Sequence, residues 1–448
     1  MLTQNSNNMP SRRKFIQTSA LASAGMAFSA KSYARIIGAN DRVQVGIAGF
    51  SDRFRSSLLP AFMQHAAELN FELIGVSDIW NRRREEGVAN LQSRFSKTIK
   101  PFRNNEELFE KGKPDAVIIS TADFQHALHC VEAVRAGCDV YVEKPLAESL
   151  DDAKLVLKTV EASDKVVQIG SQRRSGSNYW AAYDFIKSGK FGKITAVEMT
   201  WNVNQPGRWR RPELVASIKE SDTDWKRFLL NRPYEAWDPR KYLEYRLFFP
   251  YSSGIPGQWM SHQIDTVHWF SGYDHPRSVV ANGGIYMWND GRVNADTITA
   301  VFEYGPENAG PGESFQVIYS SRMHNAAGDV KEIYFSNGGT LNLDTNEITP
   351  EGGLTENHAK SMGMKPFLLE RGTLANAQRV ETGANTGVDN LTSAHMRNWM
   401  ECVRNRKTPN AGVRAGYNHS VANIMTHTAL TTGKRVTFDK LKQEVVVS

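Results

Sequence analysis

Cysteine is scarce in this sequence, with only Cys130, Cys138 and Cys402 among 448 residues. The number is odd and no pair has the Cys-x-x-Cys spacing, which argues against a disulfide framework and against a zinc site. We therefore expect three buried thiols. The chain also lacks a run of about 18 uncharged apolar residues, so we predict no membrane-spanning helix.

Most of the chain also lacks an excess of one charge. The net charge of +6 comes largely from residues 1–34, which contain Arg12, Arg13, Lys14 and Lys31 and no acidic residue. The near-neutral remainder argues against a broad basic face, so we expect no nucleic-acid partner. With 40% hydrophobic and 23% charged residues, the composition is that of a globular protein, and the length predicts at least two domains.

The first 34 residues have the pattern of an export signal. Ser11-Arg12-Arg13-Lys14-Phe15-Ile16-Gln17 precedes a mildly apolar stretch, Thr18–Ala30, and Ser32-Tyr33-Ala34 offers small residues to a signal peptidase. Paired arginines before a weakly hydrophobic segment are typical of substrates of the twin-arginine export machinery. The alternative is a disordered basic arm. We interpret residues 1–34 as a signal peptide and expect a periplasmic or otherwise exported protein.

Residues 35–165 alternate between short apolar strands and helices. This alternation predicts βαβ units and an α/β domain of Rossmann type, with a doubly wound parallel sheet. The carboxyl ends of such strands form the ligand-binding edge of the sheet. The expected strands are Val43–Ala48, Phe71–Val76, Asp115–Ser120, Cys138–Val142 and Lys165–Ile169. The expected helices are Arg55–Leu69, Arg82–Ser96, Phe124–Ala136 and Ser149–Ala162.

The first turn of this domain departs from the dinucleotide fingerprint GxGxxG. The chain reads Gly49-Phe50-Ser51-Asp52-Arg53-Phe54, in which only the first glycine is present. Ser51 adds atoms where backbone should approach a diphosphate, and Asp52 adds a negative charge that Arg53 and Arg55 could offset. We predict that the residues of this turn, Gly49, Phe50, Ser51, Asp52 and Arg53, bind a nucleotide cofactor.

Asp78 lies at the end of the second expected strand. A carboxylate at this point accepts hydrogen bonds from a ribose 2′-hydroxyl and repels a 2′-phosphate, which favours NAD over NADP as the cofactor. The alternative is that Asp78 only caps the helix that follows.

Four further segments follow in order: Ser120-Thr121-Ala122-Asp123-Phe124-Gln125-His126, Glu143-Lys144-Pro145, Gly170-Ser171-Gln172-Arg173-Arg174-Ser175 and Gly257-Gln258-Trp259-Met260-Ser261-His262-Gln263-Ile264-Asp265. Together with the turn at Gly49 and with Asp78, they resemble the Gfo/Idh/MocA oxidoreductase family. No single motif is decisive, but their order and spacing are specific, and the resemblance covers roughly residues 36–448.

The resemblance implies a second α/β domain, residues 166–448, with a large open and mostly antiparallel sheet. This sheet would provide the floor of the substrate site and often an oligomer interface, so we expect a homo-oligomer, either a dimer or a tetramer. The C-terminal helices could pack back on the first domain. The implied activity is hydride transfer between a nicotinamide cofactor and a secondary hydroxyl of a sugar, glycoside or cyclitol.

The resemblance also implies the catalytic residues. Lys144 would touch both the nicotinamide ribose and the reacting hydroxyl, and His262 would be the family's catalytic histidine. Many members have Asp where this chain has Gln258, which can orient an imidazole but cannot raise its basicity. Asp265 shares a predicted helix face with Gln258 and His262. We predict Lys144, His262, Asp265 and Gln258 as catalytic, with a core histidine as the alternative for His262.

The remaining predicted contacts fall into two groups. Beyond the glycine turn and Asp78, the predicted cofactor contacts are Thr121, His126, Glu143, Lys144 and Gln172. The predicted substrate contacts are Lys144, Arg173, Asn202, Tyr242, Arg246 and His262, because aromatic and polar side chains suit a polyol, although they also suit a loop core. His262, Asp265 and His268 have no identifiable further ligand, so we expect no metal site.

Three functions are compatible with these patterns. The first is an exported oxidoreductase with a tightly held NAD, since an exported protein would lose a cofactor that dissociates. The second is a redox-neutral, NAD-dependent enzyme that cleaves glycosides through a transient keto-sugar. The third is a sugar-binding scaffold without a cofactor, suggested by the incomplete glycine turn and Gln258. We favour the first over the second because the chain has Glu143-Lys144-Pro145, where family relatives of the glycosidase branch look different, and over the third because Lys144 and His262 are present.

Overall fold

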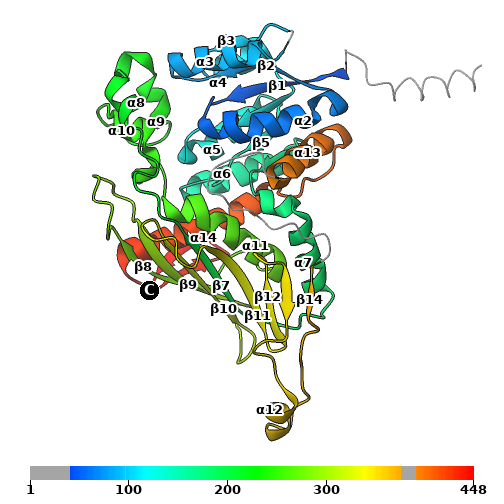
Figure 1. Ribbon diagram of the computed structural model, residues 1–448. Coiled ribbons are helices and arrows are strands. Elements are labelled where there is room, and N and C mark those ends of the chain that lie inside the picture. The colour runs from blue at the N-terminus through cyan, green and yellow to red at the C-terminus, as the bar shows by residue number, and fades with distance from the viewer. Residues whose placement is uncertain (1–40, 96, 375–389) are drawn as a thin grey trace, which may run out of the picture.

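The computed structural model describes residues 41–95, 97–374 and 390–448 of the chain (Figure 1). The predicted signal peptide therefore lies outside the described residues. In the described part, a six-stranded sheet with its helices lies above a larger ten-stranded sheet (Figure 1). The two sheets confirm the predicted fold class, a Rossmann-type domain followed by an α/β domain with an open sheet.

The first sheet contains the strands β1 (Val43–Ala48), β2 (Phe71–Ser77), β3 (Lys100–Phe102), β4 (Ala116–Ile119), β5 (Asp139–Val142) and β6 (Val167–Ile169). Its order is β3-β2-β1-β4-β5-β6 and all its pairings are parallel. The central strands β4 and β5 are buried along their whole length, as expected for strands covered on both faces. The strand β3 was not predicted, and β6 extends the sheet past the predicted domain boundary at residue 165.

Helices flank this sheet on both faces (Figure 1). They are α2 (Leu59–Leu69), α3 (Asn81–Gln92), α4 (Asn105–Glu107), α5 (His126–Arg135) and α6 (Leu150–Glu161). A π-helical turn, Phe54–Leu58, precedes α2 and continues into it. The long helical segment after β1 therefore begins directly at the glycine turn.

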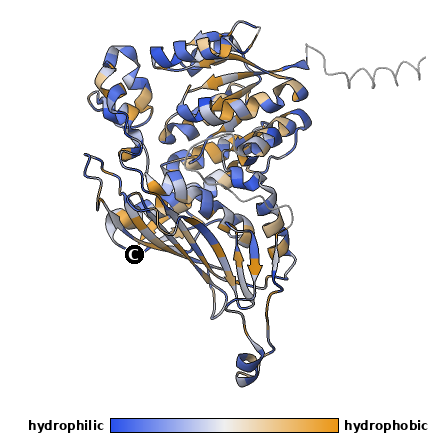
Figure 2. Cartoon of the chain, viewed as in Figure 1, coloured by the Kyte–Doolittle hydropathy of each residue, from blue (hydrophilic) through white to orange (hydrophobic). Residues whose placement is uncertain are grey.

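The second sheet contains β7 (Ile194–Asn202), β8 (Ser278–Gly284), β9 (Thr297–Tyr304), β10 (Phe315–Arg322), β11 (Val330–Ser336), β12 (Gly339–Asn342), β13 (Glu347–Thr349), β14 (Gly372–Thr373), β15 (Val436–Asp439) and β16 (Glu444–Val447). Its order is β14-β13-β12-β11-β7-β10-β9-β8-β15-β16, and among the described strands of this sheet only β7 and β10 pair in parallel. Side chains along β9 and β10 alternate between buried and more exposed, so one face carries the core. Hydrophobic and hydrophilic residues are interspersed along the strands of this sheet (Figure 2).

The remaining helices are α7 (Ser177–Lys187), α8 (Pro212–Ser217), α9 (Trp225–Leu229), α10 (Pro239–Leu243), α11 (Ser261–Ser271), α12 (Glu356–Ser361), α13 (Asn390–Asn405) and α14 (Val413–Thr432). The helices α8, α9 and α10 form a lobe that rises from the second sheet beside the first domain (Figure 1). None of the helices in the described ranges is long and apolar enough to cross a bilayer.

The helix α13 joins the hydrophobic core of the first domain. Its residue Trp399 is fully buried and packs edge-on against Tyr141 of β5, with ring centroids 5.9 Å apart. Phe71 of β2 lies on the same tryptophan, with a centroid distance of 6.0 Å. Burial of such a large apolar surface makes this late helix part of the first domain, although it follows the second sheet in the chain. Cys130, Cys138 and Cys402 are all buried free thiols, as the sequence indicated.

Candidate functional site

A cavity of about 1340 Å³ lies at the carboxyl edge of the first sheet, where residues of both domains meet. This edge is where doubly wound sheets bind ligands, and the volume exceeds that of a usual single-ligand pocket. The predicted site residues that line it are Gly49, Phe50, Ser51, Asp52, Arg53, Asp78, Thr121, His126, Glu143, Lys144, Gln172, Arg173, Tyr242, Arg246, Gln258 and His262. The cavity is therefore large enough for a dinucleotide together with a substrate.

The glycine turn is held by Ser51, which stands at the second glycine position of the fingerprint, and by Ser120 from the segment after β4. Gly49 has a φ of +87°, and a Cβ there would lie 2.8 Å from Cγ2 of Thr121. Ser51 Oγ accepts a hydrogen bond from the backbone N–H of Phe54 at 3.2 Å and donates to Ser120 Oγ at 3.2 Å. Ser51 thus caps the helix, whose N-terminus faces the cavity and suits an anionic group.

Asp52 gathers arginines from three parts of the chain. Its carboxylate pairs with Arg55 at 2.5 Å, with Arg83 of α3 at 3.2 Å and with Arg211 of the second domain at 3.2 Å. Burial would raise the pKa of Asp52, but the hydrogen bond from Arg55 and the charges of Arg83 and Arg211 hold it below its ordinary value. Arg53, which was expected to help, instead pairs with Glu143 at 3.0 Å.

Asp78 connects the glycine turn to the segment after β2. Its Oδ2 accepts a hydrogen bond from the backbone N–H of Phe50 at 2.9 Å, and its Oδ1 accepts one from Trp80 at 2.9 Å. Each carboxylate oxygen has a second lone pair, so a ribose hydroxyl can still be bound. Tyr242, predicted as a substrate contact, lies at this end of the cavity instead, because its ring packs edge-on against Trp80 at 6.3 Å.

Thr121 and His126 organise the loop after β4. The ring of His126 lies between two carbonyl oxygens, with Nδ1 at 2.8 Å from Pro145 O and Nε2 at 3.2 Å from Thr121 O. Burial lowers the pKa of His126 below its ordinary value, so the ring is neutral and donates one hydrogen bond. This histidine therefore anchors the turn that carries Lys144. Gln172 lines the cavity beside this turn and donates to Glu143 at 3.4 Å.

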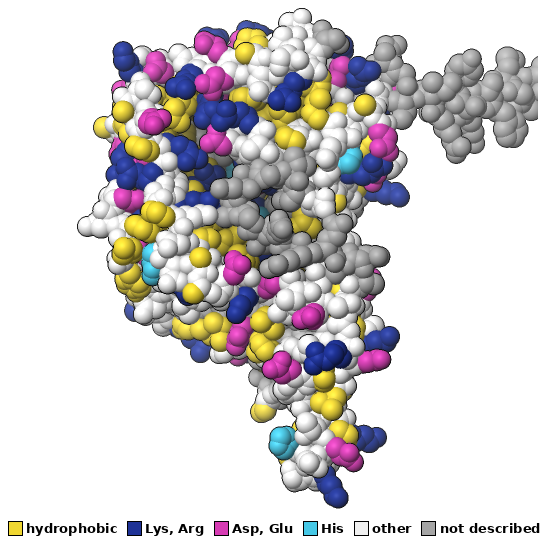
Figure 3. Space-filling view, viewed as in Figure 1, with side chains coloured by type: hydrophobic (Ala, Val, Ile, Leu, Met, Phe, Trp, Pro, Cys, Tyr) yellow, Lys and Arg dark blue, Asp and Glu magenta, His cyan; other side chains and the backbone are white. Residues whose placement is uncertain are grey.

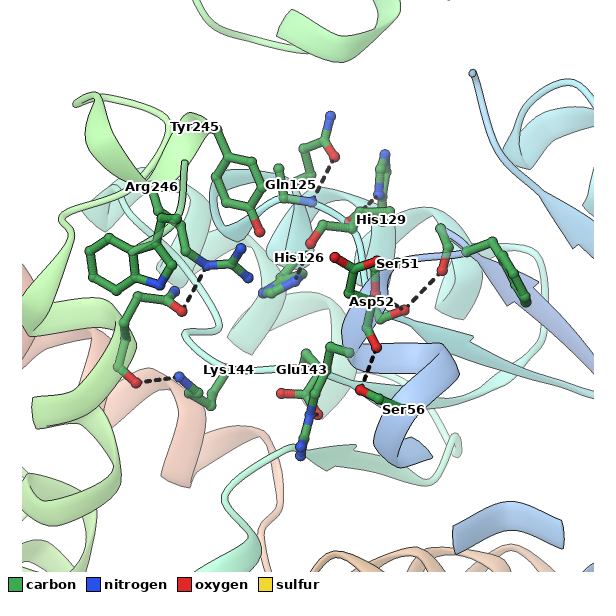
Figure 4. Close-up of a pocket in the computed structure, with 18 of the residues that line it drawn as sticks. Ser51, Asp52, Ser56, Gln125, His126, His129, Glu143, Lys144, Tyr245 and Arg246 are labelled. Carbon is green, nitrogen blue, oxygen red and sulfur yellow. Dashed lines mark hydrogen bonds and ion pairs between the residues drawn. The ribbon is translucent and has the colours of Figure 1, made fainter. Parts of the chain in front are cut away.

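Lys144 places its amine at the junction of the two domains. The amine donates to the backbone oxygen of Gln258 at 2.5 Å (Figure 4). Burial lowers the pKa of Lys144 to about 8, against the opposing charges of Glu143 and Asp123. Because this value is near physiological pH, the amine can both accept and return a proton.

His262 lies in the first turn of α11 and stacks on Trp201 of β7, with a centroid distance of 5.8 Å. Burial, and then the charges of Lys144 and Arg173, lower the pKa of His262 well below its ordinary value. The imidazole is therefore neutral at physiological pH. It can hydrogen-bond a hydroxyl, whereas Lys144 is the better group for proton transfer.

Gln258 does not orient the histidine, contrary to our expectation. Its Oε1 accepts a hydrogen bond from Arg246 Nε at 2.8 Å (Figure 4). Its Nε2 donates to Asp123 Oδ2 at 2.5 Å. Asp123 also accepts from Ser252 at 2.6 Å. The carboxylate in this region thus comes from the first domain. Asp123 belongs to the motif Ser120–His126, but the motif alone predicted no role for this residue.

Two predicted site residues, Asp265 and Asn202, do not line the cavity. The carboxylate of Asp265 is fully buried and accepts two hydrogen bonds from Arg174, at 2.7 and 2.9 Å. The amide of Asn202 donates to the backbone oxygen of Ala327 at 3.2 Å. The predictions of a catalytic Asp265 and a substrate-binding Asn202 are therefore wrong for this structure, because both side chains are held by other parts of the second domain.

Trp201, Trp209 and Trp259 together form an aromatic wall of the cavity. The sequence did not predict that these three side chains lie together. Trp201 and Trp259 are parallel within 3° at a centroid distance of 6.0 Å, and Trp209 lies 5.5 Å from Trp259. Trp209 has a φ of +68°, a left-handed conformation that costs a non-glycine residue about 1–2 kcal/mol. Flat apolar faces of this kind suit the C–H surfaces of a sugar.

The first domain matches a known family. Residues 43–171 match the Gfo/Idh/MocA model, described as an oxidoreductase family with an NAD-binding Rossmann fold. The match supports the resemblance carried by the sequence motifs. It also agrees with the cavity, whose predicted cofactor residues lie at the expected edge of the sheet.

Curated relatives match shorter stretches. The chain is 33% identical to 1,5-anhydro-D-fructose reductase from Ensifer adhaerens over 135 residues, which are 28% of this chain and 40% of that protein. It is 30% identical to inositol 2-dehydrogenase from Rubrobacter xylanophilus over 161 residues, which are 35% of this chain and 42% of that protein. The matches thus span about two fifths of the length of these relatives.

The similarity in fold is more extensive. A levoglucosan dehydrogenase solved in complex with NADH and levoglucosan has a TM-score of 0.62 and 13% identity to this chain. The match covers 88% of this chain and 99% of that protein. Both domains therefore have the fold of that structure.

Proposed function

We propose that this chain is an NAD-dependent oxidoreductase of the Gfo/Idh/MocA type that oxidises or reduces a secondary hydroxyl of a sugar, glycoside or cyclitol. The observation that carries the proposal is the Lys144 amine, whose pKa is about 8, at the junction of a Rossmann edge and an aromatic wall. The family match over residues 43–171 and the sugar and cyclitol enzymes among the relatives support it.

The residues present suit a nicotinamide dinucleotide. The helix N-terminus after Ser51 and the arginines around Asp52 suit a diphosphate, and Asp78 suits a ribose hydroxyl. The carboxylate of Asp78 would repel a 2′-phosphate, which favours NAD over NADP. When bound, the oxidised nicotinamide ring supplies the hydride acceptor.

The protein's own contribution is to position the substrate and move one proton. As the carbinol C–H bond releases its hydride, the hydroxyl proton passes to the neutral amine of Lys144, leaving a ketone and a lysine ammonium. His262 hydrogen-bonds the same hydroxyl, and the aromatic wall excludes water from one side. In the reverse direction the ammonium returns the proton to the forming alcohol.

The experiment starts from the nucleotide that copurifies. We expect heat denaturation of the purified protein to release NAD(H), identified by absorbance and mass, and a panel of sugars and glycosides to yield a keto-sugar with reduced cofactor. Release of an aglycone without net reduction would favour the redox-neutral glycoside-cleaving alternative. A protein that carries no nucleotide and ignores added NAD would be the scaffold.

The variant Lys144→Met tests the central residue. Because it removes the proton acceptor, we expect kcat to fall about 10²–10⁴-fold while the unfolding midpoint changes little. Lys193→Met is the matched control, since Lys193 is exposed and lies outside the cavity lining. Wild-type turnover in Lys144→Met would remove this lysine from the mechanism.

The proposal includes export and self-association. The twin-arginine pattern at Arg12 and Arg13 supports export of a folded protein with its cofactor inside, and the open second sheet supports a dimer or tetramer. Cell fractionation of the paired variant Arg12→Lys and Arg13→Lys checks the first, and light scattering checks the second. A wild-type protein found in the cytoplasm would contradict the proposed export, and a monomer would contradict the proposed self-association.

A further inference from the structure

The substrate end of the cavity is the part lined by Lys144, His262 and the aromatic wall. Lys144 reaches it from a turn between β5 and α6 that has no regular secondary structure, and residues 145–147 of this turn are buried. Buried backbone N–H and C=O groups need hydrogen-bond partners, which outside helices and strands come from side chains or other loops. The groups that provide these partners decide where the amine of Lys144 lies.

Two consecutive residues of α14 provide acceptors to this turn. The backbone N–H of Leu146 donates to Nε2 of His419 at 3.3 Å, and that of Ala147 donates to Oγ of Ser420 at 3.1 Å. Both side chains of α14 are fully buried. Together with His126 of the first domain, they hold the backbone directly after the lysine.

The ring of His419 serves the turn as an acceptor. A backbone N–H can only donate, so Nε2 carries no proton, and the neutral ring has its proton on Nδ1. Burial lowers the pKa of His419 to about 4, although the charge of Asp265 opposes this shift. The ring therefore stays neutral throughout the physiological pH range. It is placed to hold the turn and not to transfer a proton.

The helix α14 approaches the turn closely. At Gly416, about one turn before His419, a Cβ would lie 2.7 Å from Cδ2 of Leu146 and 2.9 Å from Cγ1 of Ile169. The loop before the helix is bonded to the first sheet, because the N–H of Ile169 in β6 donates to Ala411 O at 2.8 Å. Such close packing leaves the helix little freedom to slide along the first domain. The two acceptors are thus held in a fixed place.

The same helix supports the segment that carries His262. It contacts α6 and β6 as well as α11 and β8, and Figure 1 shows it between the two sheets. Thr426 Oγ1 donates to Sδ of Met260 at 3.9 Å, two residues before His262. The charge of Lys144 lowers the pKa of both His262 and His419, so the three groups are close enough to interact. One helix therefore backs both Lys144 and His262.

The contact between α14 and the turn is uncharged. Charged side chains of both signs are spread over the surface of the molecule (Figure 3). His419 and Ser420 lie beneath this surface and bond to backbone groups. Salt screens exposed charges much more than buried neutral groups. We therefore expect the contact to keep its geometry at high ionic strength.

We propose that His419 and Ser420 are positioning residues, which hold the turn after β5 so that the amine of Lys144 and the imidazole of His262 reach the same hydroxyl. The inference rests on the proposed function and adds two residues to its machinery. Neither side chain lines the cavity, so both act through the backbone of the turn. A reacting group displaced by about 1 Å can lose about 10²-fold in rate.

Two pairs of variants test the inference. His419→Leu removes one acceptor, whereas His419→Gln brings an amide oxygen to the place of Nε2. Ser420→Ala and Ser420→Thr make the same comparison at the other acceptor. With the sugar that the holoprotein turns over best, we expect kcat to fall about 10–100-fold in His419→Leu and Ser420→Ala, with KM and NAD affinity little changed. His419→Gln and Ser420→Thr should recover most of this loss, at low and at high salt.

The matched control is His268→Leu. His268 is a buried histidine of α11 whose Nε2 lies 2.9 Å from the hydroxyl of Tyr304, in the second sheet. Its replacement also removes a buried hydrogen bond, so chemical denaturation should show a comparable loss of stability, but kcat should stay near that of the wild type. If His268→Leu loses as much kcat as His419→Leu, the role of His419 is structural and the inference is wrong.

The pKa of Lys144 tests the inference without turnover. The pH dependence of acetylation by acetic anhydride, followed by mass spectrometry, measures this pKa, which burial lowers to about 8. A released turn lets water reach the amine, so we expect the pKa to rise toward its ordinary value in His419→Leu and Ser420→Ala, and to stay in place in His268→Leu. The variants leave unchanged the charged groups that face the amine, namely Glu143, Asp123, Arg246 and Arg53.

This measurement separates the two proposals. A rise of the pKa of Lys144 in a protein that oxidises and reduces nothing would leave the positioning role standing while the proposed function fails. An unchanged pKa of Lys144 in both His419→Leu and Ser420→Ala would overturn the inference, whatever the turnover of sugars.

Discussion

The amine of Lys144 lies in a field set by four charged neighbours. Glu143 and Asp123 raise its pKa, whereas Arg246 and Arg53 lower it, and burial is the largest influence and lowers it to about 8. The carboxylate of Asp123 is itself fixed by two hydrogen bonds from the second domain. The protonation of Lys144 therefore depends on the contact between the two domains.

The pH profile of the reaction follows from this field. Alcohol oxidation needs the neutral amine, so kcat/KM for oxidation should rise through pH 8 and level off above it. The variant Asp123→Asn removes a charge that stabilises the ammonium, which lowers the pKa of Lys144 and moves the rising limb to lower pH. Initial rates with a neutral sugar over pH 6–10 measure the shift.

The matched control is Asp151→Asn, because Asp151 is exposed on α6 and lies outside the cavity lining. The rising part of the pH profile of Asp151→Asn should coincide with that of the wild type. If the rising part of the pH profile of Asp123→Asn does not shift, or shifts to higher pH, the role assigned to the carboxylate of Asp123 is contradicted.

For single residues, sequence motifs correctly predicted the location of side chains that the backbone positions. They did not predict the location of side chains that depends on how helices and strands pack. Lys144 follows a buried strand, so its place at the sheet edge could be read from the sequence. Asp265 shares a helix face with His262, but that face continues past the cavity and meets Arg174. The spacing of residues along a helix shows which side chains share a face, but it does not show how far the cavity extends along that face.

Among the elements, the strands of the first sheet were largely predictable because βαβ units alternate regularly. The strand β7 was not predicted, and its last residue, Asn202, was interpreted as a substrate contact. In fact β7 is central in the second sheet, and Trp201 near its end contributes to the aromatic wall. The strand β7 thus contributes residues both to the hydrophobic core and to the cavity, and amino-acid composition alone does not distinguish these two roles. For the C-terminal helix α13, the sequence did not indicate that Trp399 packs against Phe71 of β2 and Tyr141 of β5.

The turn between β1 and the helix gives a prediction at the element scale. In Gly49→Ala the new Cβ meets Thr121 at 2.8 Å and Ser120 O at 3.1 Å, and the φ of +87° is unfavourable for alanine. We expect the turn to shift and NAD affinity to fall at least 10-fold, with a loss of stability of roughly 1–2 kcal/mol. Equilibrium titration with NAD and chemical denaturation measure the two effects.

Gly189→Ala separates strain from position. Gly189 has a similar φ of +80° and open space around its Cβ, so it should lose comparable stability without losing NAD affinity. Equal NAD affinity in the wild type and Gly49→Ala would mean that the turn does not contact the cofactor.

For the whole molecule, the contact between Asp52 and Arg211 links the glycine turn of the first domain to the loop before α8. The same loop carries Arg208 and Trp209, so the segment that crosses to the first domain also lines the substrate end. One segment therefore joins the proposed cofactor site to the proposed substrate end, which fits the proposal of an exported protein with a retained cofactor.

Removal of this link should speed the loss of the cofactor. In Arg211→Gln the pair with Asp52 is absent, and since both side chains are more than 40% exposed the pair contributes only about 0.2–1 kcal/mol. We expect the dissociation rate of NADH to rise about 1.4- to fivefold, with the difference shrinking at high salt. Arg210→Gln is the matched control, because Arg210 pairs with Glu244 within the second domain. Stopped-flow fluorescence of NADH release measures both variants, and equal rates would show that the crossing segment does not retain the cofactor.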